Sequence, residues 1–172
     1  MSQVSDFLVT TNSGYTAQVG RLVSMLHYAR QSTLAAVEGL TIAQLDHLEH
    51  PQSNSIGALL LHIAAAEMGY QASTFYKRAL TEEENAKWGN ALALGDKARQ
   101  SIKGNPLSFY LDRLQKIREI TLQELALRND EWLEEETSYG PNRINNYFKW
   151  FYVLTHEVNH RGQIRMLRNH LS

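Results

Sequence analysis

Hydrophobic residues recur at helical spacing over long stretches of the chain, and no segment alternates apolar and polar residues as a strand would. The first stretch runs roughly from Tyr15 to Glu38, and Gly39 after it is a typical helix stop. Its inward positions follow one another in steps of three and four: Val19, Leu22, Leu26, Ala29, Thr33 and Val37. This spacing places them on one face and predicts an amphipathic helix.

Three more stretches carry the same spacing, and capping signals mark where they begin. The second helix is expected after Ser53 or Asn54, either of which can accept a hydrogen bond from a free amide of the first turn. The third is announced by Asn105, followed by Pro106 at the first helical position. The fourth follows the turn YGPN and runs from about Arg143 almost to the last residue.

A long segment, residues 80–105, separates the second helix from the third. It opens with Thr81 and Glu84 in a capping-box pattern, which predicts a short helix, and Thr41 with Gln44 forms a similar pattern after the first long helix. A connection of this length is able to carry the chain back along the bundle and leave the second and third helices parallel. We therefore expect an all-α, four-helix bundle that forms a single domain over residues 1–172.

The composition narrows the classes of function. The 172 residues carry a formal net charge of -1 without a basic stripe, so binding to nucleic acid through phosphate neutralisation is not expected. The chain has no cysteine, which excludes disulfides, thiolate metal sites and a cysteine nucleophile. It opens without a signal-peptide pattern and has no apolar run long enough to span a bilayer, so we expect a cytoplasmic protein with no membrane contact.

Residues 156–160 read HEVNH, the HExxH pattern of zinc peptidases. His156 and His160 are four residues apart, so they lie on one face of a helix, a turn from each other. That face continues as Ile164 and Leu167, so both imidazoles are expected to point into the bundle. Burying two imidazoles is unfavourable unless both find partners, which favours a role as metal ligands.

A peptidase takes its third ligand from downstream of this pattern, and the chain offers none there. One peptidase class needs a histidine where Met166 stands, and the other needs a glutamate on a later helix, but the sequence stops at Ser172. A di-iron bundle is also disfavoured, because Glu157 and His160 form the only Glu-x-x-His pair in the sequence. The third ligand must therefore come from an earlier helix.

His62 is the inward histidine of the second helix, within the apolar run IGALLLHIAAAE. We therefore predict a metal site formed by His62, His156 and His160, a ligand set that suits Zn, Ni or Fe(II). A metal-free bundle with three neutral core histidines is the alternative. The remaining histidines are expected at the surface: His27, His47, His50 and His170.

Three polar residues near the predicted ligands are candidates for further roles. Glu157 lies about 100° round the helix from His156, which allows either a base or orienting group at the rim of the site or a solvated charge. Gln163, near His160, is expected to hydrogen-bond a ligand or an imidazole. Glu67 is expected in the pocket. The aromatic residues of NNYFKWFYVL surround the fourth helix, so some are expected to form a pocket wall or a dimer contact.

These stretches resemble the DinB superfamily of bacterial four-helix proteins. The resemblance rests on NSIGALLLHIAAAE in the second helix, HEVNHRGQI in the fourth and RQSTLAAVEGLTIAQLD at the end of the first, and it spans essentially the whole chain. It implies an up-down-down-up bundle, often a homodimer, that holds a divalent metal. Carried onto this sequence, the ligands are His62, His156 and His160.

The resemblance also implies a class of chemistry. Characterised members include a mycothiol-dependent isomerase and S-transferases that use low-molecular-weight thiols such as bacillithiol. The leading hypothesis is therefore a metal-dependent thiol S-transferase acting on a small-molecule substrate, with an external thiol activated by the metal. The same metal could instead activate water for hydrolysis. The alternative from a different class is a non-catalytic metal- or ligand-binding dimer with a role in stress.

Overall fold

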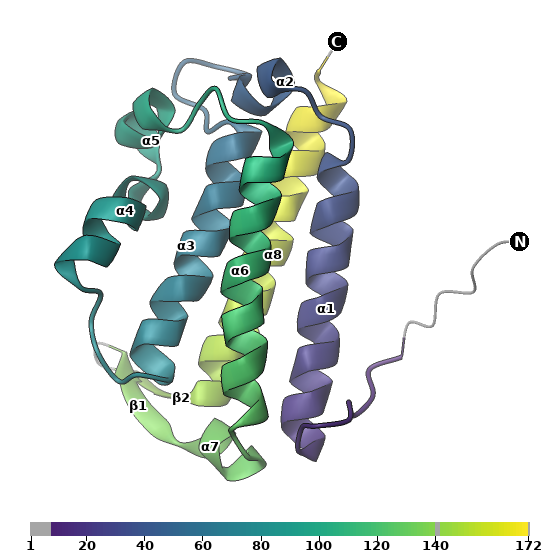
Figure 1. Ribbon diagram of the computed structural model, residues 1–172, viewed down its shortest axis with the longest axis vertical. Helices are drawn as coiled ribbons and strands as arrows, with labels where there is room; N and C mark the ends of the chain where they lie inside the picture. Colours follow the sequence, from purple (N-terminus) through teal and green to yellow (C-terminus); the bar gives the residue numbers. More distant parts are fainter. Residues whose placement is uncertain (1–7, 140–141, 172) are drawn as a thin grey trace, which may run out of the picture.

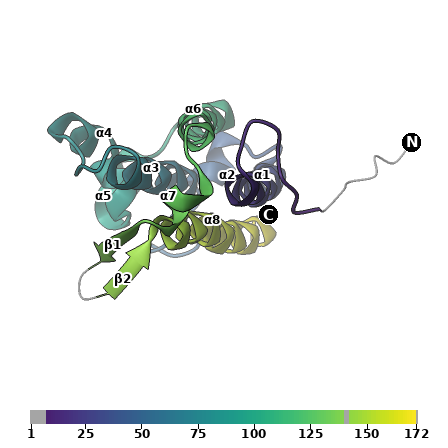
Figure 2. The same ribbon diagram turned by 90° about the horizontal axis from the view of Figure 1, so that it is seen from below.

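Four long helices form the body of the protein. The structure is a computed structural model that describes residues 8–139 and 142–171. The long helices are α1 (Ala17–Val37), α3 (Ile56–Thr74), α6 (Leu107–Ala126) and α8 (Asn146–Asn169). They lie side by side (Figure 1), and α8 packs against α1 and α3 while α3 packs against α6 (Figure 2). The predicted all-α class is confirmed.

The chain runs along α1 and α8 in one direction and along α3 and α6 in the other (Figure 1). Between α3 and α6 the chain returns through α4 (Glu82–Ala93) and α5 (Gly95–Ser101), and α4 packs against α3. Two shorter helices, α2 (Ile42–Asp46) and α7 (Asp130–Glu134), lie at opposite ends of the bundle. The long connection thus leaves the two middle helices parallel. No helix formed by residues 8–139 or 142–171 has the length and apolar character needed to cross a membrane.

The capping signals were partly right. Both capping boxes are present, at Thr41 and Thr81. The cap of α3 is neither Ser53 nor Asn54 but Ser55, whose side chain accepts a hydrogen bond from the amide of Ala58.

The predicted start of α6 is wrong by one residue. Pro106 is itself the extended N-cap residue, and Asn105 does not cap the helix. Proline serves there because the amide that it lacks would have been unpaired at a helix start in any case.

A β-hairpin precedes α8, which corrects the expectation of a chain without strands. Strands β1 (Glu136–Tyr139) and β2 (Asn142–Asn145) pair antiparallel, and residues 140–141 of the expected YGPN turn lie outside the described residues. Each strand has four residues, too few for an alternating pattern to show in the sequence. Consequently α8 begins at Asn146, capped by the side chain of Asn145, and not at about Arg143.

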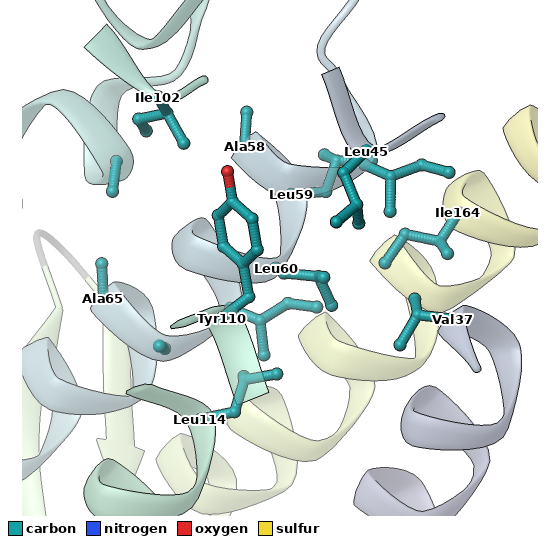
Figure 3. Packing of buried hydrophobic residues seen from close by; sticks show 14 of the residues in the cluster. Val37, Leu45, Ala58, Leu59, Leu60, Ala65, Ile102, Tyr110, Leu114 and Ile164 are labelled. Carbon is teal, nitrogen blue, oxygen red and sulfur yellow. The ribbon is translucent and has the colours of Figure 1, made fainter. Parts of the chain in front are cut away.

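The core consists of two apolar clusters, one towards each end of the bundle. The cluster nearer the hairpin includes Val19, Leu22, Leu26, Leu125, Trp132 and Trp150. The cluster nearer α2 includes Val37, Leu45, Leu60, Tyr110, Leu114 and Ile164. In the second cluster, the ring of Tyr110 from α6 reaches towards Ala58 and Ile102 (Figure 3). The stretch of bundle between the two clusters is charged.

Candidate metal centre

Three histidines from two neighbouring helices meet on the α3–α8 side of the bundle. His62 of α3 lies with its Nε2 atom 3.0 Å from Nε2 of His156, and Nε2 of His160 lies 3.1 Å from the same atom. The three candidate ligand atoms all lie within 4.8 Å of one another. Imidazole nitrogens arranged tetrahedrally around Zn²⁺ at about 2 Å would be separated by about 3.3 Å, so the two short separations are close to those of a ligand set.

The other ring nitrogens orient the imidazoles. Nδ1 of His62 lies 2.8 Å from the carbonyl oxygen of Ala91 in α4, and Nδ1 of His160 lies 2.8 Å from Oε1 of Gln163. Both oxygens accept hydrogen bonds, so both Nδ1 atoms carry the proton, and the Nε2 atoms of His62 and His160 are left with lone pairs. Holding the second nitrogen in this way fixes the tautomer that a metal-binding histidine needs.

This arrangement fits a cation. Two lone pairs face Nε2 of His156, and a neutral imidazole has at most one proton there to donate. One of the two short contacts therefore joins two acceptors, unless a positive ion lies among the three nitrogens. Burial, followed by the neighbouring His160 and His62, lowers the pKa of His156 to about 4. Burial likewise lowers the pKa of His62. Both rings are thus neutral near pH 7, the state in which imidazole binds metals.

Behind the histidines, each of the four long helices contributes one charged residue to a single buried cluster. We call Arg30 of α1, Glu67 of α3, Arg118 of α6 and Glu157 of α8 the charged quartet. Arg30 Nη2 lies 3.0 Å from Glu67 Oε2, and Arg30 Nε lies 2.9 Å from Glu157 Oε1. Arg118 Nε lies 2.7 Å from Glu67 Oε1, and Arg118 Nη2 lies 2.9 Å from Glu157 Oε2. Each cation thus contacts both anions, and the formal charges cancel.

The quartet lies between the two apolar clusters and is closed by further hydrogen bonds. On α1, Leu26 and Val37 of the two clusters flank Arg30. Thr121 donates a hydrogen bond to Glu67 Oε1 at 2.7 Å. Burial alone would raise the pKa of Glu67, but Arg118 and Arg30 outweigh it and lower that pKa to about 2. The carboxyl group is therefore ionised throughout the physiological range.

Two expectations for the acidic residues are wrong in position. Glu157 does not lie at the rim or in solvent, and Glu67 does not line a pocket; both side chains are 1% exposed. Helical spacing defines the faces of these two residues only approximately, and their partners, Arg30 and Arg118, were not predicted. A signal was present: Arg118 continues the spacing of Leu114 and Thr121 on the inner face of α6. An arginine at an inner position requires a buried acid opposite it.

An apolar pocket of about 690 Å³ adjoins the histidines along the same α3–α8 side. Its wall includes Ala66, Tyr70, Leu92, Phe148, Lys149 and Tyr152. Ala66 follows His62 by one helical turn, and the ring of Tyr152 lies 6.0 Å from the ring of His156. Two residues of the aromatic run of α8 thus form a pocket wall, while Trp150 is in the core.

The four other histidines are exposed, as expected: His27, His47, His50 and His170. Among residues 8–139 and 142–171, the cluster of His62, His156 and His160 is the only group of His, Asp and Glu side chains with metal-ligand spacing.

Comparison with known proteins relates the sequence of the chain to one family. The model of the family described as mycothiol S-transferase matches residues 21–172. No curated protein sequence matches the chain.

Several solved structures share the fold. A DinB-like protein from Bacillus cereus ATCC 10987 is 17% identical, with 87% of this chain and 89% of that one covered and a TM-score of 0.65. A conserved protein from Enterococcus faecalis is 15% identical, with 86% and 93% covered and a TM-score of 0.66. The colibactin self-resistance protein ClbS, solved in complex with double-stranded DNA, is 14% identical, with 90% and 97% covered and a TM-score of 0.64. The predicted DinB-like fold is confirmed.

Proposed function

The chain belongs to the mycothiol S-transferase family, and from this premise we propose that it transfers a low-molecular-weight thiol to a small electrophile at a metal centre held by His62, His156 and His160. The observation that carries the proposal is the convergence of three Nε2 atoms, two of which present lone pairs because their Nδ1 atoms are bound elsewhere. A divalent cation at this point supplies the positive charge that favours the thiolate form of a thiol near neutral pH.

The residues around the centre orient the histidine rings. Ala91 and Gln163 hold the rings of His62 and His160, and the charged quartet fixes the rotation of α8, which presents both His156 and His160. The apolar pocket beside the rings offers space for the electrophile. Because the chain has no cysteine, the sulfur must be brought by a substrate. In the reaction a carbon–sulfur bond forms, the leaving group departs with its electron pair, and the thiol proton passes to solvent.

Glu157 has no free oxygen for proton transfer in this proposal, since both of its oxygens accept hydrogen bonds from arginines. We therefore assign it a positioning role and not that of a catalytic base. Hydrolysis at the same centre and a non-catalytic metal-binding role are the alternatives that the experiments must separate.

Duplex DNA is a further alternative, raised by the ClbS complex. At 14% identity that likeness shows the fold alone, and the formal net charge of this chain is -1. We therefore propose a small-molecule thiol as the partner. A mobility-shift assay with duplex DNA tests this choice, and tight, salt-sensitive binding would contradict it.

The decisive experiment has two stages. Elemental mass spectrometry on the untagged protein should find about one Zn, Ni or Fe per chain, lost in His62→Ala and kept in His27→Ala, which removes an exposed histidine. Mycothiol and bacillithiol are then offered with monochlorobimane, and thiol transfer should require both metal and His62. If the protein contains no metal and does not bind added Zn or Ni, the proposed metal centre is refuted. Bound metal without turnover of any thiol would support the non-catalytic alternative.

A further inference from the structure

Lys149 stands in the wall of the apolar pocket without a counter-ion. Its side chain belongs to the first turn of α8 and is only 9% exposed. Within residues 8–139 and 142–171, no carboxylate or other side chain forms a hydrogen bond or ion pair with its ammonium group. The residue as a whole is nine-tenths buried while its ammonium group has no carboxylate partner, so this positive charge is available to an anion in the pocket.

The acidic residues nearby are already engaged. Lys149 also borders a second pocket of about 430 Å³, whose wall includes Glu135 and Glu136. Glu135 lies 3.4 Å from the Nζ atom of Lys77, and Glu136 forms a two-pronged pair with Arg143. Neither carboxylate neutralises Lys149.

The helix increases the positive potential at this point. The free amides at the start of a helix carry a partial positive charge, so acidic residues normally occupy the first turn. The first turn of α8 contains no acidic residue and places Lys149 there instead. Lysine charge and helix dipole therefore act in the same direction, and both favour an anion in the pocket. Burial with no compensating partner also lowers the pKa of Lys149.

We propose that this pocket binds a carboxylate-bearing small molecule with an apolar or aromatic body, and that Lys149 pairs with the carboxylate. The inference rests on the proposed function and adds the substrate class. Tyr70, Phe148 and Tyr152 provide an aromatic wall for the body. Lys149 precedes His156 by seven residues on the same side of α8, or about 10 Å of helix. A substrate that reaches from Lys149 to the histidines therefore has a length of this order, which suits a body of one or two rings.

The test uses naphthoate as the probe and naphthamide as its uncharged counterpart, with binding to the full-length, metal-loaded protein measured by calorimetry. The wild type should bind naphthoate about tenfold or more tightly than naphthamide. Lys149→Met should abolish this preference, and Lys149→Arg should retain most of it. Lys97→Met, which removes an exposed lysine, is the matched control and should change nothing.

A second variant tests the pocket without altering charge. An added Cβ at Gly69, on the pocket wall, meets no atom within 4 Å, so Gly69→Leu extends into the pocket and should weaken both probes. Equal binding of the two probes by wild type, no binding of either, or a naphthoate preference that survives Lys149→Met would overturn the proposal.

The same titration on His62→Ala separates this proposal from the metal centre. If His62→Ala still prefers naphthoate, the preference is due to Lys149, whether or not the variant binds metal. If His62→Ala loses the preference, the carboxylate binds the metal, and the role of Lys149 is refuted. If transfer activity is found, KM is measured for the thiol and for the electrophile in Lys149→Met. The substrate whose KM rises is the one that carries the carboxylate.

Discussion

Arg118 and Glu67 face each other in a two-pronged ion pair, with Nε–Oε1 and Nη2–Oε2 distances of 2.7 and 3.0 Å, in the middle of a protein interior. Buried ion pairs contribute little net stability compared with apolar packing, but removing one partner leaves an uncompensated charge. The pair therefore makes the fold sensitive to any change in the quartet, and the histidines on α3 and α8 depend on that fold.

Arg118→Met should lower the free energy of unfolding by about 3–5 kcal/mol, because it leaves Glu67 and Glu157 with a single cation between them. Urea unfolding followed by circular dichroism measures the loss. Arg143→Met breaks an exposed pair with Glu136 and should leave the unfolding curve almost unchanged. Equal effects of the two variants would contradict the quartet.

Lowering the pH should destabilise the protein over a pH range that is defined by the pKa of Glu67. Its pKa is lowered from 4.5 to about 2 in the folded state, so the stabilisation that it contributes is complete above pH 4.5 and is lost as pH falls towards 2. The loss attributable to this group is up to about 3 kcal/mol. Unfolding curves of wild type and Glu67→Gln between pH 6 and 3 measure it. The stability difference between the two proteins should shrink as pH falls, and a constant difference would refute the assignment.

Added Zn²⁺ should stabilise the wild type and not His62→Ala. A ligand that binds only the folded state adds about 2.7 kcal/mol when its free concentration is a hundred times Kd. Thermal unfolding with and without Zn²⁺ measures the shift, and His27→Ala should behave as wild type does. A shift of equal size in His62→Ala would show that the ion binds elsewhere.

Lys149→Met should raise the midpoint of thermal unfolding, by roughly 2–4 °C for each kcal/mol gained. Methionine keeps the apolar stem of lysine and replaces the charged group by an apolar one at a position that is only 9% exposed. Lys97→Met is again the control and should leave the midpoint in place. A lower midpoint for Lys149→Met would mean that the ammonium group has a partner.

Gly57→Ala should cost about 1–3 kcal/mol, because the new Cβ would lie 2.6 Å from the hydroxyl oxygen and 2.8 Å from Cζ of the buried Tyr110. Gly69→Ala, in the same helix, meets nothing within 4 Å and should instead stabilise by about 0.5–1 kcal/mol. Chemical denaturation of the two variants measures the contrast. Similar values would contradict the close packing of α3 on α6.

The cluster of three histidines was accessible to sequence reasoning, whereas the charged quartet was not. His156 and His160 are tied by helical spacing alone, and His62 followed from the need for a ligand on a facing helix. The roles of Arg30 and Arg118 depend on how helices far apart in sequence are rotated against each other, which a single amphipathic pattern defines only coarsely. The hairpin was not predicted for a different reason: its four-residue strands are too short to produce a periodic pattern in the sequence.

The return segment between α3 and α6 has a consequence for how such proteins diversify. Ala91 in this segment holds the ring of His62 through its backbone carbonyl, which any amino acid at that position would supply, while the adjacent Leu92 forms part of the pocket wall. A substitution at Leu92 therefore changes the pocket wall while leaving that carbonyl in place, whereas Ala91 itself is buried in the core. Changes at Leu92 alter which molecule the pocket accepts without altering how the ring of His62 is held.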